Sequence, residues 1–123
     1  MPALVFLVPT MRCNLDCITC GIRHNMKLPE RRPPGTQFEA EMPWDEWKII
    51  IDQIGQFHPG VLISGGEPLM SENTIPIIRR LVHKHGLYVN LGTNGLLLGQ
   101  YARELAVSGI NRLFISVDGF GAV

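Results

Sequence analysis

Residues 3–20 read ALVFLVPTMRCNLDCITC, an apolar run that leads directly into three closely spaced cysteines. Residues 3–8 are apolar without interruption, which predicts a strand buried on both faces in a parallel sheet. The cysteines are Cys13, Cys17 and Cys20, they follow the spacing C-x3-C-x2-C, and the chain has no others. Because soft thiolates on one short segment can surround a metal centre, these residues are candidate metal ligands.

Three interpretations of these cysteines are open. A [4Fe–4S] cluster normally has four cysteine ligands, so three cysteines would leave one iron open to a small molecule. A structural zinc site would use His24, four residues after Cys20, as its fourth ligand, although the spacing differs from the usual paired C-x2-C motifs. The third interpretation is three unrelated thiols. An odd number of cysteines without a secretion signal argues against a disulfide framework.

The length and the composition limit the classes of protein that the chain can form. Its 123 residues and 13.7 kDa are enough for one domain, and its 46% hydrophobic residues argue against disorder. Eleven Lys and Arg residues balance eleven Asp and Glu residues, so there is no basic field for nucleic acid or an anionic membrane. No apolar run reaches the ~18–20 residues of a membrane span, and no signal peptide is recognisable. A cytoplasmic location is therefore expected.

After a proline-rich, loop-like segment over residues 21–43, apolar strands alternate with amphipathic helical patterns. The predicted strands cover residues 3–8, 61–63, 88–91 and 112–117, and the predicted helices cover residues 44–57, 72–86 and 98–107. Ser71 and Gly86 are the expected N-cap and C-cap of the middle helix. Strand–helix alternation at this spacing predicts successive right-handed βαβ units, and hence an α/β fold with a parallel sheet.

Each predicted strand runs into cysteine or polar residues, and the carboxyl ends of parallel strands share the edge of a sheet where ligands bind. Glycines let the backbone approach a ligand closely, the Glu67 carboxylate can accept from an ammonium group, and Ser116 and Asp118 suit sugar hydroxyls. Each motif alone is also an ordinary turn, but the four together predict an active site. In strand order they are the three cysteines, Gly65-Gly66-Glu67-Pro68, Thr93-Asn94, and Ser116 with Asp118.

In this order the motifs resemble those of the radical S-adenosylmethionine (SAM) enzymes, over nearly the whole chain. The most similar subgroup is that of molybdenum-cofactor biosynthesis protein A and the peptide-modifying maturases. The resemblance implies a partial (β/α) barrel of parallel strands that holds a [4Fe–4S] cluster and SAM. It rests on CNLDCITC at residues 13–20, GGEP at residues 65–68, TNG at residues 93–95 and ISVDG at residues 115–119.

The resemblance also implies roles for individual residues. Cys13, Cys17 and Cys20 would hold three irons of the cluster, and the amino and carboxylate groups of SAM would chelate the fourth. Gly65, Gly66 and Glu67, with Pro68 beside them, would bind the methionine amino group. Asn94 would line the cavity, and Ser116 and Asp118 would bind the ribose.

The implied reaction begins with one electron from a donor such as flavodoxin or ferredoxin. SAM would be cleaved to methionine and a 5′-deoxyadenosyl radical, which would take a hydrogen atom from a substrate of unknown identity. The chemistry belongs to the cluster and SAM, so no side chain is expected to act as general acid, base or nucleophile.

Two features depart from the family pattern. Thr19 stands before the last cysteine, where the family usually has an aromatic residue, which affects the expected packing beside the adenine. The family core has about six strands, and a complete eightfold barrel takes roughly 250 residues, whereas four strands are predicted here. We therefore expect residues 1–123 to be the N-terminal portion of a radical SAM core, with a bare apolar edge at the fourth strand. The alternative functions are a non-catalytic iron–sulfur electron-transfer module and a Cys3His structural zinc domain.

Overall fold

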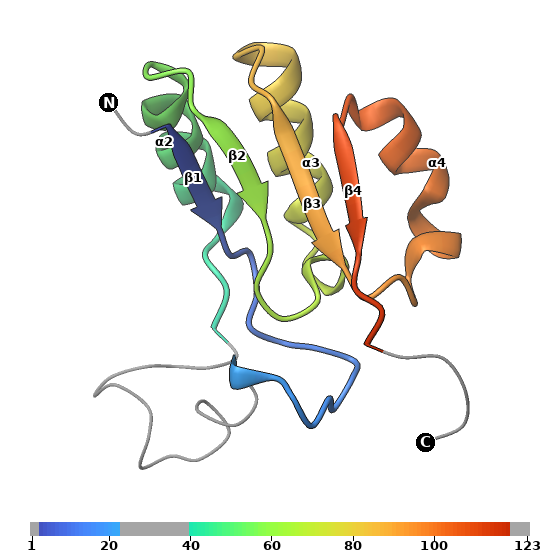
Figure 1. Ribbon diagram of the computed structural model, residues 1–123. Coiled ribbons are helices and arrows are strands. Elements are labelled where there is room, and N and C mark those ends of the chain that lie inside the picture. Colours follow the sequence, from blue (N-terminus) through green and yellow to red (C-terminus); the bar gives the residue numbers. More distant parts are fainter. Residues whose placement is uncertain (1–2, 23–39, 119–123) are drawn as a thin grey trace.

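The computed structural model describes residues 3–22 and 40–118, which form a four-stranded sheet and the helices that cover it (Figure 1). All strands run parallel in the order β1-β2-β3-β4, as expected for successive βαβ units. Among the described residues the sheet is open, which confirms the predicted α/β fold with a partial barrel of four strands. The strands are β1 (Leu4–Leu7), β2 (Gly60–Ile63), β3 (Val89–Thr93) and β4 (Arg112–Ile115).

Three α-helices lie on one face of this sheet: α2 (Trp44–Gly55), α3 (Thr74–Arg79) and α4 (Leu98–Ser108) (Figure 1). Between the helices and the sheet lies a core of aliphatic side chains, which stabilises the fold by about 25 cal/mol for each Å² of apolar surface buried. Most of the predicted loop at 21–43, with the candidate ligand His24, lies outside the described residues, as do residues 119–123. The buried core includes Leu7, Val61, Ile63, Val89 and Leu91 from the strands and Ile51, Ile77, Ile78, Leu81 and Leu105 from the helical segments.

The other face of the sheet is exposed over much of the part that the structure describes. Leu4 and Phe6 of β1 are 48% and 63% exposed, and every residue of β4 is exposed. The prediction that residues 3–8 are buried on both faces is therefore wrong for these described residues, because the helices cover only one face. The expected bare apolar edge is confirmed, since Leu113 and Phe114 of β4 are exposed.

The middle helical segment differs most from its prediction. A short 3-10 helix, η2 (Pro68–Met70), precedes α3, and α3 continues into a π-helix, η3 (Arg80–Lys84). Ser71 caps the end of η2 and is not the N-cap of α3, because α3 begins at Thr74 and its N-cap is Asn73. The Ser71 hydroxyl donates to Glu41 Oε2 at 2.8 Å and accepts from Asn73 N–H at 3.4 Å. The C-cap of the segment is His85 and not Gly86 as predicted; Gly86 follows it with a φ of +64°, and its N–H donates to the Val82 carbonyl at 2.9 Å.

The helical layer is tied together by an ionic cluster on its outer side. Asp52 of α2 accepts from Arg80 Nε at 2.9 Å and from Lys84 Nζ at 2.7 Å. Hydrogen bonds from Arg80, Lys84 and His85 hold the pKa of Asp52 well below its ordinary value.

Over residues 3–22 and 40–118, the structure has no helix with the length and apolarity that a membrane crossing requires.

Candidate functional site

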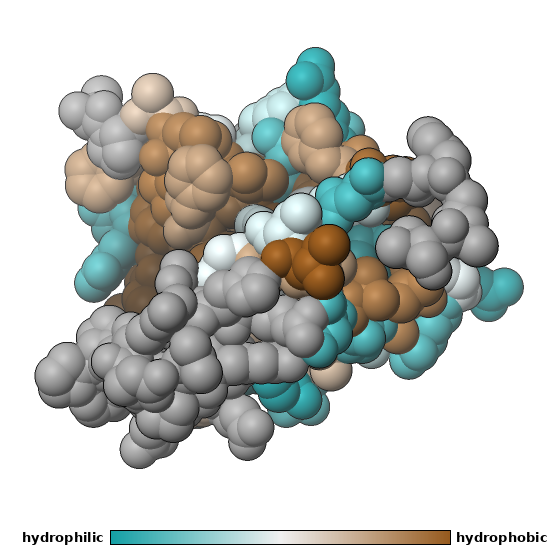
Figure 2. Space-filling view, turned by 60° about the horizontal axis from the view of Figure 1, so that its bottom comes forward, coloured by the Kyte–Doolittle hydropathy of each residue, from teal (hydrophilic) through white to brown (hydrophobic). Residues whose placement is uncertain are grey.

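The four strand ends meet around a cavity of about 240 Å³. Figure 1 shows that every strand points toward the cysteine segment, and Figure 2 brings this end of the molecule forward. There, surface of intermediate hydropathy lies between apolar side chains, which suits a ligand with both polar and apolar parts. The predicted convergence of the four motifs at one edge of the sheet is therefore confirmed. The cavity is lined by Cys17, Thr19, Cys20, Ser64, Gly65, Gly66, Gly92, Thr93, Asn94, Ser116 and Asp118.

The two glycines after β2 allow residues 10–12, which lead into Cys13, to pack directly on them. Gly65 has a φ of +126°, and a Cβ at this position would lie 2.7 Å from the Thr10 carbonyl oxygen. A Cβ on Gly66 would overlap the carbonyl of Arg12. Instead, Gly66 N–H donates to the Thr10 carbonyl at 3.1 Å, and Glu67 N–H donates to the Arg12 carbonyl at 2.7 Å. The glycines thus fix the backbone that leads into Cys13 as well as exposing their own backbone to the cavity.

Glu67 has a fully buried carboxylate that accepts hydrogen bonds from within the protein. Its Oε1 accepts from Leu69 N–H at 3.1 Å and from the Thr93 hydroxyl at 2.8 Å, and its Oε2 accepts from Asn94 N–H at 2.8 Å. These bonds join the loop after β2 to the end of β3 and offset the cost of burying a charged group. The carboxylate does not line the cavity, so Gly65 and Gly66 form the part of the motif that faces it.

Asn94 connects the end of β3 to the cysteine segment. Its Nδ2 donates to Asn14 Oδ1 at 2.7 Å and lies 3.8 Å from Cys13 Sγ, within hydrogen-bond range of sulfur. Its Oδ1 accepts from Leu96 N–H at 3.0 Å, which fixes the orientation of the amide. Asn94 is among the residues that line the cavity at the strand ends, and its contact with Cys13 was not predicted from the sequence.

The cysteines lie on a turn beside the cavity. Cys13 is exposed, Cys17 and Cys20 are partly exposed, and none of them is in a disulfide. The Cys20 N–H donates to the Cys17 carbonyl at 3.2 Å, and the Leu15 N–H lies 3.5 Å from Cys13 Sγ. Backbone donors directed at cysteine sulfur are a means by which proteins tune iron–sulfur clusters.

The donor set consists of soft thiolates, which are the usual ligands of iron–sulfur clusters. In residues 3–22 and 40–118, no three His, Cys, Asp or Glu side chains are gathered so that they could hold one metal ion. A [4Fe–4S] cluster binds its thiolates through separate irons, so its ligand sulfurs do not have to converge on one point. Three soft thiolates on one loop beside a cavity suit an iron–sulfur cluster.

Of the remaining predicted site residues, Ser116 and Asp118 line the cavity and Pro68 does not. Ser116 and Asp118 both follow β4, which ends at Ile115 and is shorter than the predicted strand over residues 112–117. The N–H of Ser116 still donates to the Thr93 carbonyl at 2.9 Å, which keeps this segment beside β3. Pro68 is buried as the first residue of η2 and is not among the residues that line the cavity.

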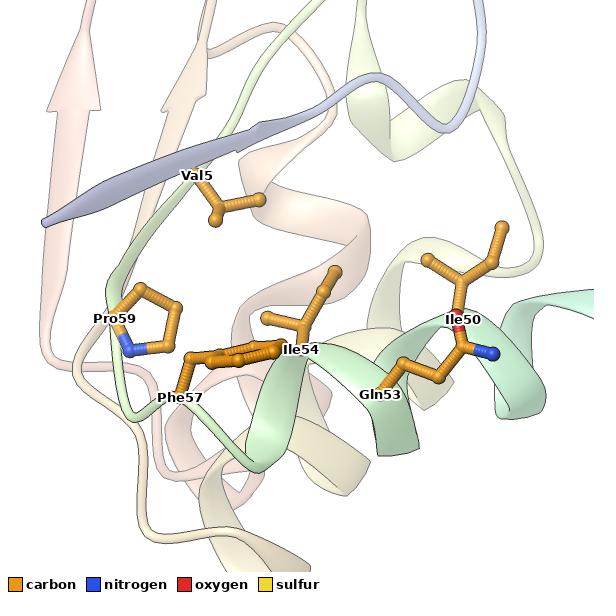
Figure 3. Close-up of a pocket in the computed structure, with 6 residues that line it drawn as sticks. All are labelled: Val5, Ile50, Gln53, Ile54, Phe57 and Pro59. Carbon is orange, nitrogen blue, oxygen red and sulfur yellow. The ribbon is translucent and has the colours of Figure 1, made fainter. Parts of the chain in front are cut away.

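A second cavity, of about 260 Å³, lies between the outer edge of β1 and α2 (Figure 3). Its lining is almost entirely apolar and contains no titratable side chain, so it offers no chemistry of its own. Polar and cysteine residues converge instead at the strand ends, which are therefore the candidate active site. The second cavity is lined by Val5, Ile50, Gln53, Ile54, Phe57 and Pro59.

Comparison with protein families places the chain in a class. The family model described as the radical SAM superfamily matches residues 7–122. The chain belongs to the radical SAM superfamily. This result confirms the family that the cysteine spacing and the residues after each strand indicate.

Curated relatives of this chain carry several names. The GTP 3′,8-cyclase of Heliobacterium modesticaldum is 36% identical over 111 residues, which make up 89% of this chain and 32% of the relative. The AdoMet-dependent heme synthase of Methanosarcina barkeri is 33% identical over 123 residues, 98% of this chain and 32% of the relative. The Fe-coproporphyrin III synthase of the same organism is 31% identical over 112 residues, 89% of this chain and 26% of the relative. The chain thus spans about a third or less of the length of these relatives.

Proposed function

We propose that residues 1–123 form the N-terminal portion of the core domain of a radical SAM enzyme, with residues 21–43 as a loop insertion. The observation that carries this proposal is the cavity at the strand ends. There the cysteine loop meets Gly65 and Gly66, Asn94, and the pair Ser116 and Asp118. Membership of the radical SAM superfamily supports a cluster and SAM as the cofactors.

In this proposal the cysteines are the cluster ligands. Cys13, Cys17 and Cys20 hold three irons of a [4Fe–4S] cluster and leave the fourth for the amino and carboxylate groups of SAM. When bound, the cluster and SAM supply reductive cleavage of SAM and a 5′-deoxyadenosyl radical that abstracts hydrogen from the substrate. A one-electron donor such as flavodoxin or ferredoxin is the partner that this chemistry requires.

The other cavity residues orient SAM. The partly exposed backbone at Gly65 and Gly66 would bind the methionine amino group, and Glu67 and Pro68 would support that backbone from the protein interior. The hydroxyl of Ser116 and the carboxylate of Asp118 are suited to bond the ribose hydroxyls. Asn94 lies between these groups and the cysteine segment and helps to exclude water from the cavity.

The relatives do not single out one substrate. Their identities to this chain are nearly equal, at 36%, 33% and 31%, although one is named for a GTP cyclisation and two for the synthesis of heme or an iron coproporphyrin. The proposal is therefore limited to two steps. These are the cleavage of SAM, which would be common to the family, and hydrogen abstraction from a substrate that is not assigned.

The test is the formation of 5′-deoxyadenosine. Full-length protein, prepared anaerobically and reduced, is mixed with SAM, and the products are separated by chromatography beside a Cys17→Ser variant. We expect 5′-deoxyadenosine and methionine from the wild type and at least about a hundredfold less from the variant. An iron-loaded wild type that forms no 5′-deoxyadenosine would instead favour an electron-transfer module, and a zinc-loaded one would favour a structural zinc domain.

A further inference from the structure

An ion pair joins the two ends of the segment that carries the cysteines. Arg12 directly precedes Cys13, and Glu41 lies 29 positions after Arg12, so all three cysteines fall between them. Arg12 Nε donates to Glu41 Oε1 at 2.8 Å, and Arg12 Nη2 lies 2.6 Å from the same oxygen. The Arg12 guanidinium also donates to the carbonyl of Met70, the last residue of η2, at 3.0 Å.

The Glu41 carboxylate is held on its other side as well. Its Oε2 accepts from the Ser71 hydroxyl at 2.8 Å, and its side chain is only 17% exposed. Burial alone would raise the pKa of Glu41, but hydrogen bonds from Thr10, Ser71 and Arg12 outweigh it and hold the pKa below the ordinary value of 4.5. Glu41 is therefore a charged acceptor with both oxygens engaged.

The same pair is also anchored through the main chain. The N–H of Arg12 donates to the Thr10 hydroxyl at 3.0 Å, and the Arg12 carbonyl accepts from Glu67 N–H at 2.7 Å. On the opposite side, Asn73 Nδ2 donates to the carbonyl of Met42, the residue after Glu41, at 3.2 Å. The beginning and the end of the cysteine segment are thus both fixed to the stretch that follows β2.

This arrangement differs from an ordinary surface ion pair. Lys48 and Asp45 of α2 also pair, but they are three positions apart on one helix and Asp45 is 88% exposed. Pairs of that kind contribute little and hold nothing together beyond their own helix. Arg12 and Glu41 instead join distant parts of the chain and share two further hydrogen bonds, with Met70 and Ser71.

We propose that Arg12 and Glu41 are positioning residues that clasp the ends of the cysteine segment and thereby hold Cys13 in place for cluster binding. Fixing both ends of a stretch of chain lowers the number of arrangements that the ligands within it can take before the metal centre forms. Loss of the clasp then releases Cys13 first, because Cys13 is bonded directly to Arg12. This inference rests on the proposed cluster at the three cysteines.

The experiment compares Arg12→Gln, Glu41→Gln and the double variant with the wild type, using full-length protein prepared anaerobically. Asp45→Asn, which removes the exposed pair on α2, is the matched control. The first readout is the rate of iron loss to a chelator, and the second is amide hydrogen exchange of the peptide that covers residues 12–20. We expect each single variant to lose iron several-fold faster than the wild type. The double variant should lose iron no faster than the faster of the two single variants, because both substitutions break the same pair. Asp45→Asn should lose iron at the wild-type rate. Exchange should rise in residues 12–20 and stay unchanged in β2 and β3.

The outcomes separate the clasp from the proposed function. If the wild type takes up no iron, the cluster proposal fails, while hydrogen exchange still tests whether the pair holds the segment. If the wild type is loaded and all variants lose iron at its rate, the clasp is contradicted. Loss of protection throughout the sheet would also contradict it, since that is the result of a merely structural pair. Should Arg12→Gln fail to fold, Arg12→Lys keeps the charge and is expected to lose iron at an intermediate rate.

Discussion

The carboxylate of Glu67 and the hydroxyl of Thr93 lie 2.8 Å apart in the interior of the protein, and both residues are at least 97% buried. This bond joins the loop after β2 to the last residue of β3, and the neighbouring Asn94 reaches from there to Cys13. The cavity edge is therefore held from behind by a buried charged group whose oxygens all have donors within the protein.

Replacement of Glu67 by Gln should destabilise the fold. A glutamine amide keeps one acceptor oxygen, but its NH2 group replaces the other oxygen and faces a donor such as Asn94 N–H. One buried hydrogen bond is then lost, and one donor is left unsatisfied. We expect the free energy of unfolding to fall by about 1–3 kcal/mol in urea denaturation. The control is Glu104→Gln on the exposed side of α4, which should change it by less than about 0.5 kcal/mol. Equal effects of the two substitutions would contradict the role of Glu67.

Gly66→Ala should displace the backbone that leads into the cysteines. The new Cβ would lie 2.6 Å from the Met11 carbonyl oxygen and would overlap the Arg12 carbonyl. We expect a loss of about 1–3 kcal/mol in stability and reduced iron content after anaerobic loading. Gly99→Ala is the matched control, because a Cβ there meets nothing within 4 Å and alanine favours the helix. An iron content of Gly66→Ala equal to that of Gly99→Ala would show that the close approach is unimportant.

Asn94→Asp should make the cluster harder to reduce. Aspartate keeps the acceptor that bonds Leu96 N–H, but it replaces the N–H donor near Cys13 Sγ with a negative charge. Both changes disfavour the added electron, so the midpoint potential should become more negative. A redox titration monitored by electron paramagnetic resonance measures this shift. Asn111→Asp, before β4 at the opposite end of the sheet, should leave the potential unchanged, and a positive shift for Asn94→Asp would refute the assignment.

The stabilising effect of Glu41 should not depend on pH near neutrality. Because the pKa of Glu41 is lowered in the folded protein, its contribution is complete above the unfolded value and is lost only as the pH falls through the folded value. Glu41→Gln should therefore lower the free energy of unfolding by about 1–2 kcal/mol, and this loss should be the same from about pH 8 to about pH 5. Urea denaturation across this range checks the prediction. A cost that already shrinks between about pH 7 and 5 would mean that the carboxylate is not held as a charged acceptor.

The sequence predicted the location of the site well, because the carboxyl ends of parallel strands must share an edge. Gly65, Gly66, Asn94 and the cysteines needed only that topology to be brought together. The buried state of Glu67 could not be predicted in the same way, since it depends on donors from Thr93 and Asn94, far along the chain. A carboxylate in the loop after one strand and a threonine at the end of the next strand form the pattern that could have suggested it.

The wrong predictions also have long-range causes. Ser71 has the residue type of an N-cap, but it ends η2, α3 begins only at Thr74, and its hydroxyl donates to Glu41, 30 positions earlier. The apolar run at residues 3–8 resembles a strand buried on both sides, yet Phe6 lies on the face that the helices leave open. Local patterns indicated the order of strands and helical segments correctly but not the form of the middle helical segment, and the partners of individual side chains depended on segments distant in the sequence.

The most direct measurement of the central claim is the metal content of anaerobically prepared full-length protein, compared with that of its Cys17→Ser variant. If the three cysteines hold a [4Fe–4S] cluster, the wild type should carry about four more irons and four more sulfides per chain than the variant, and no stoichiometric zinc. A colourless wild type that contains tightly bound zinc and no iron would contradict the account.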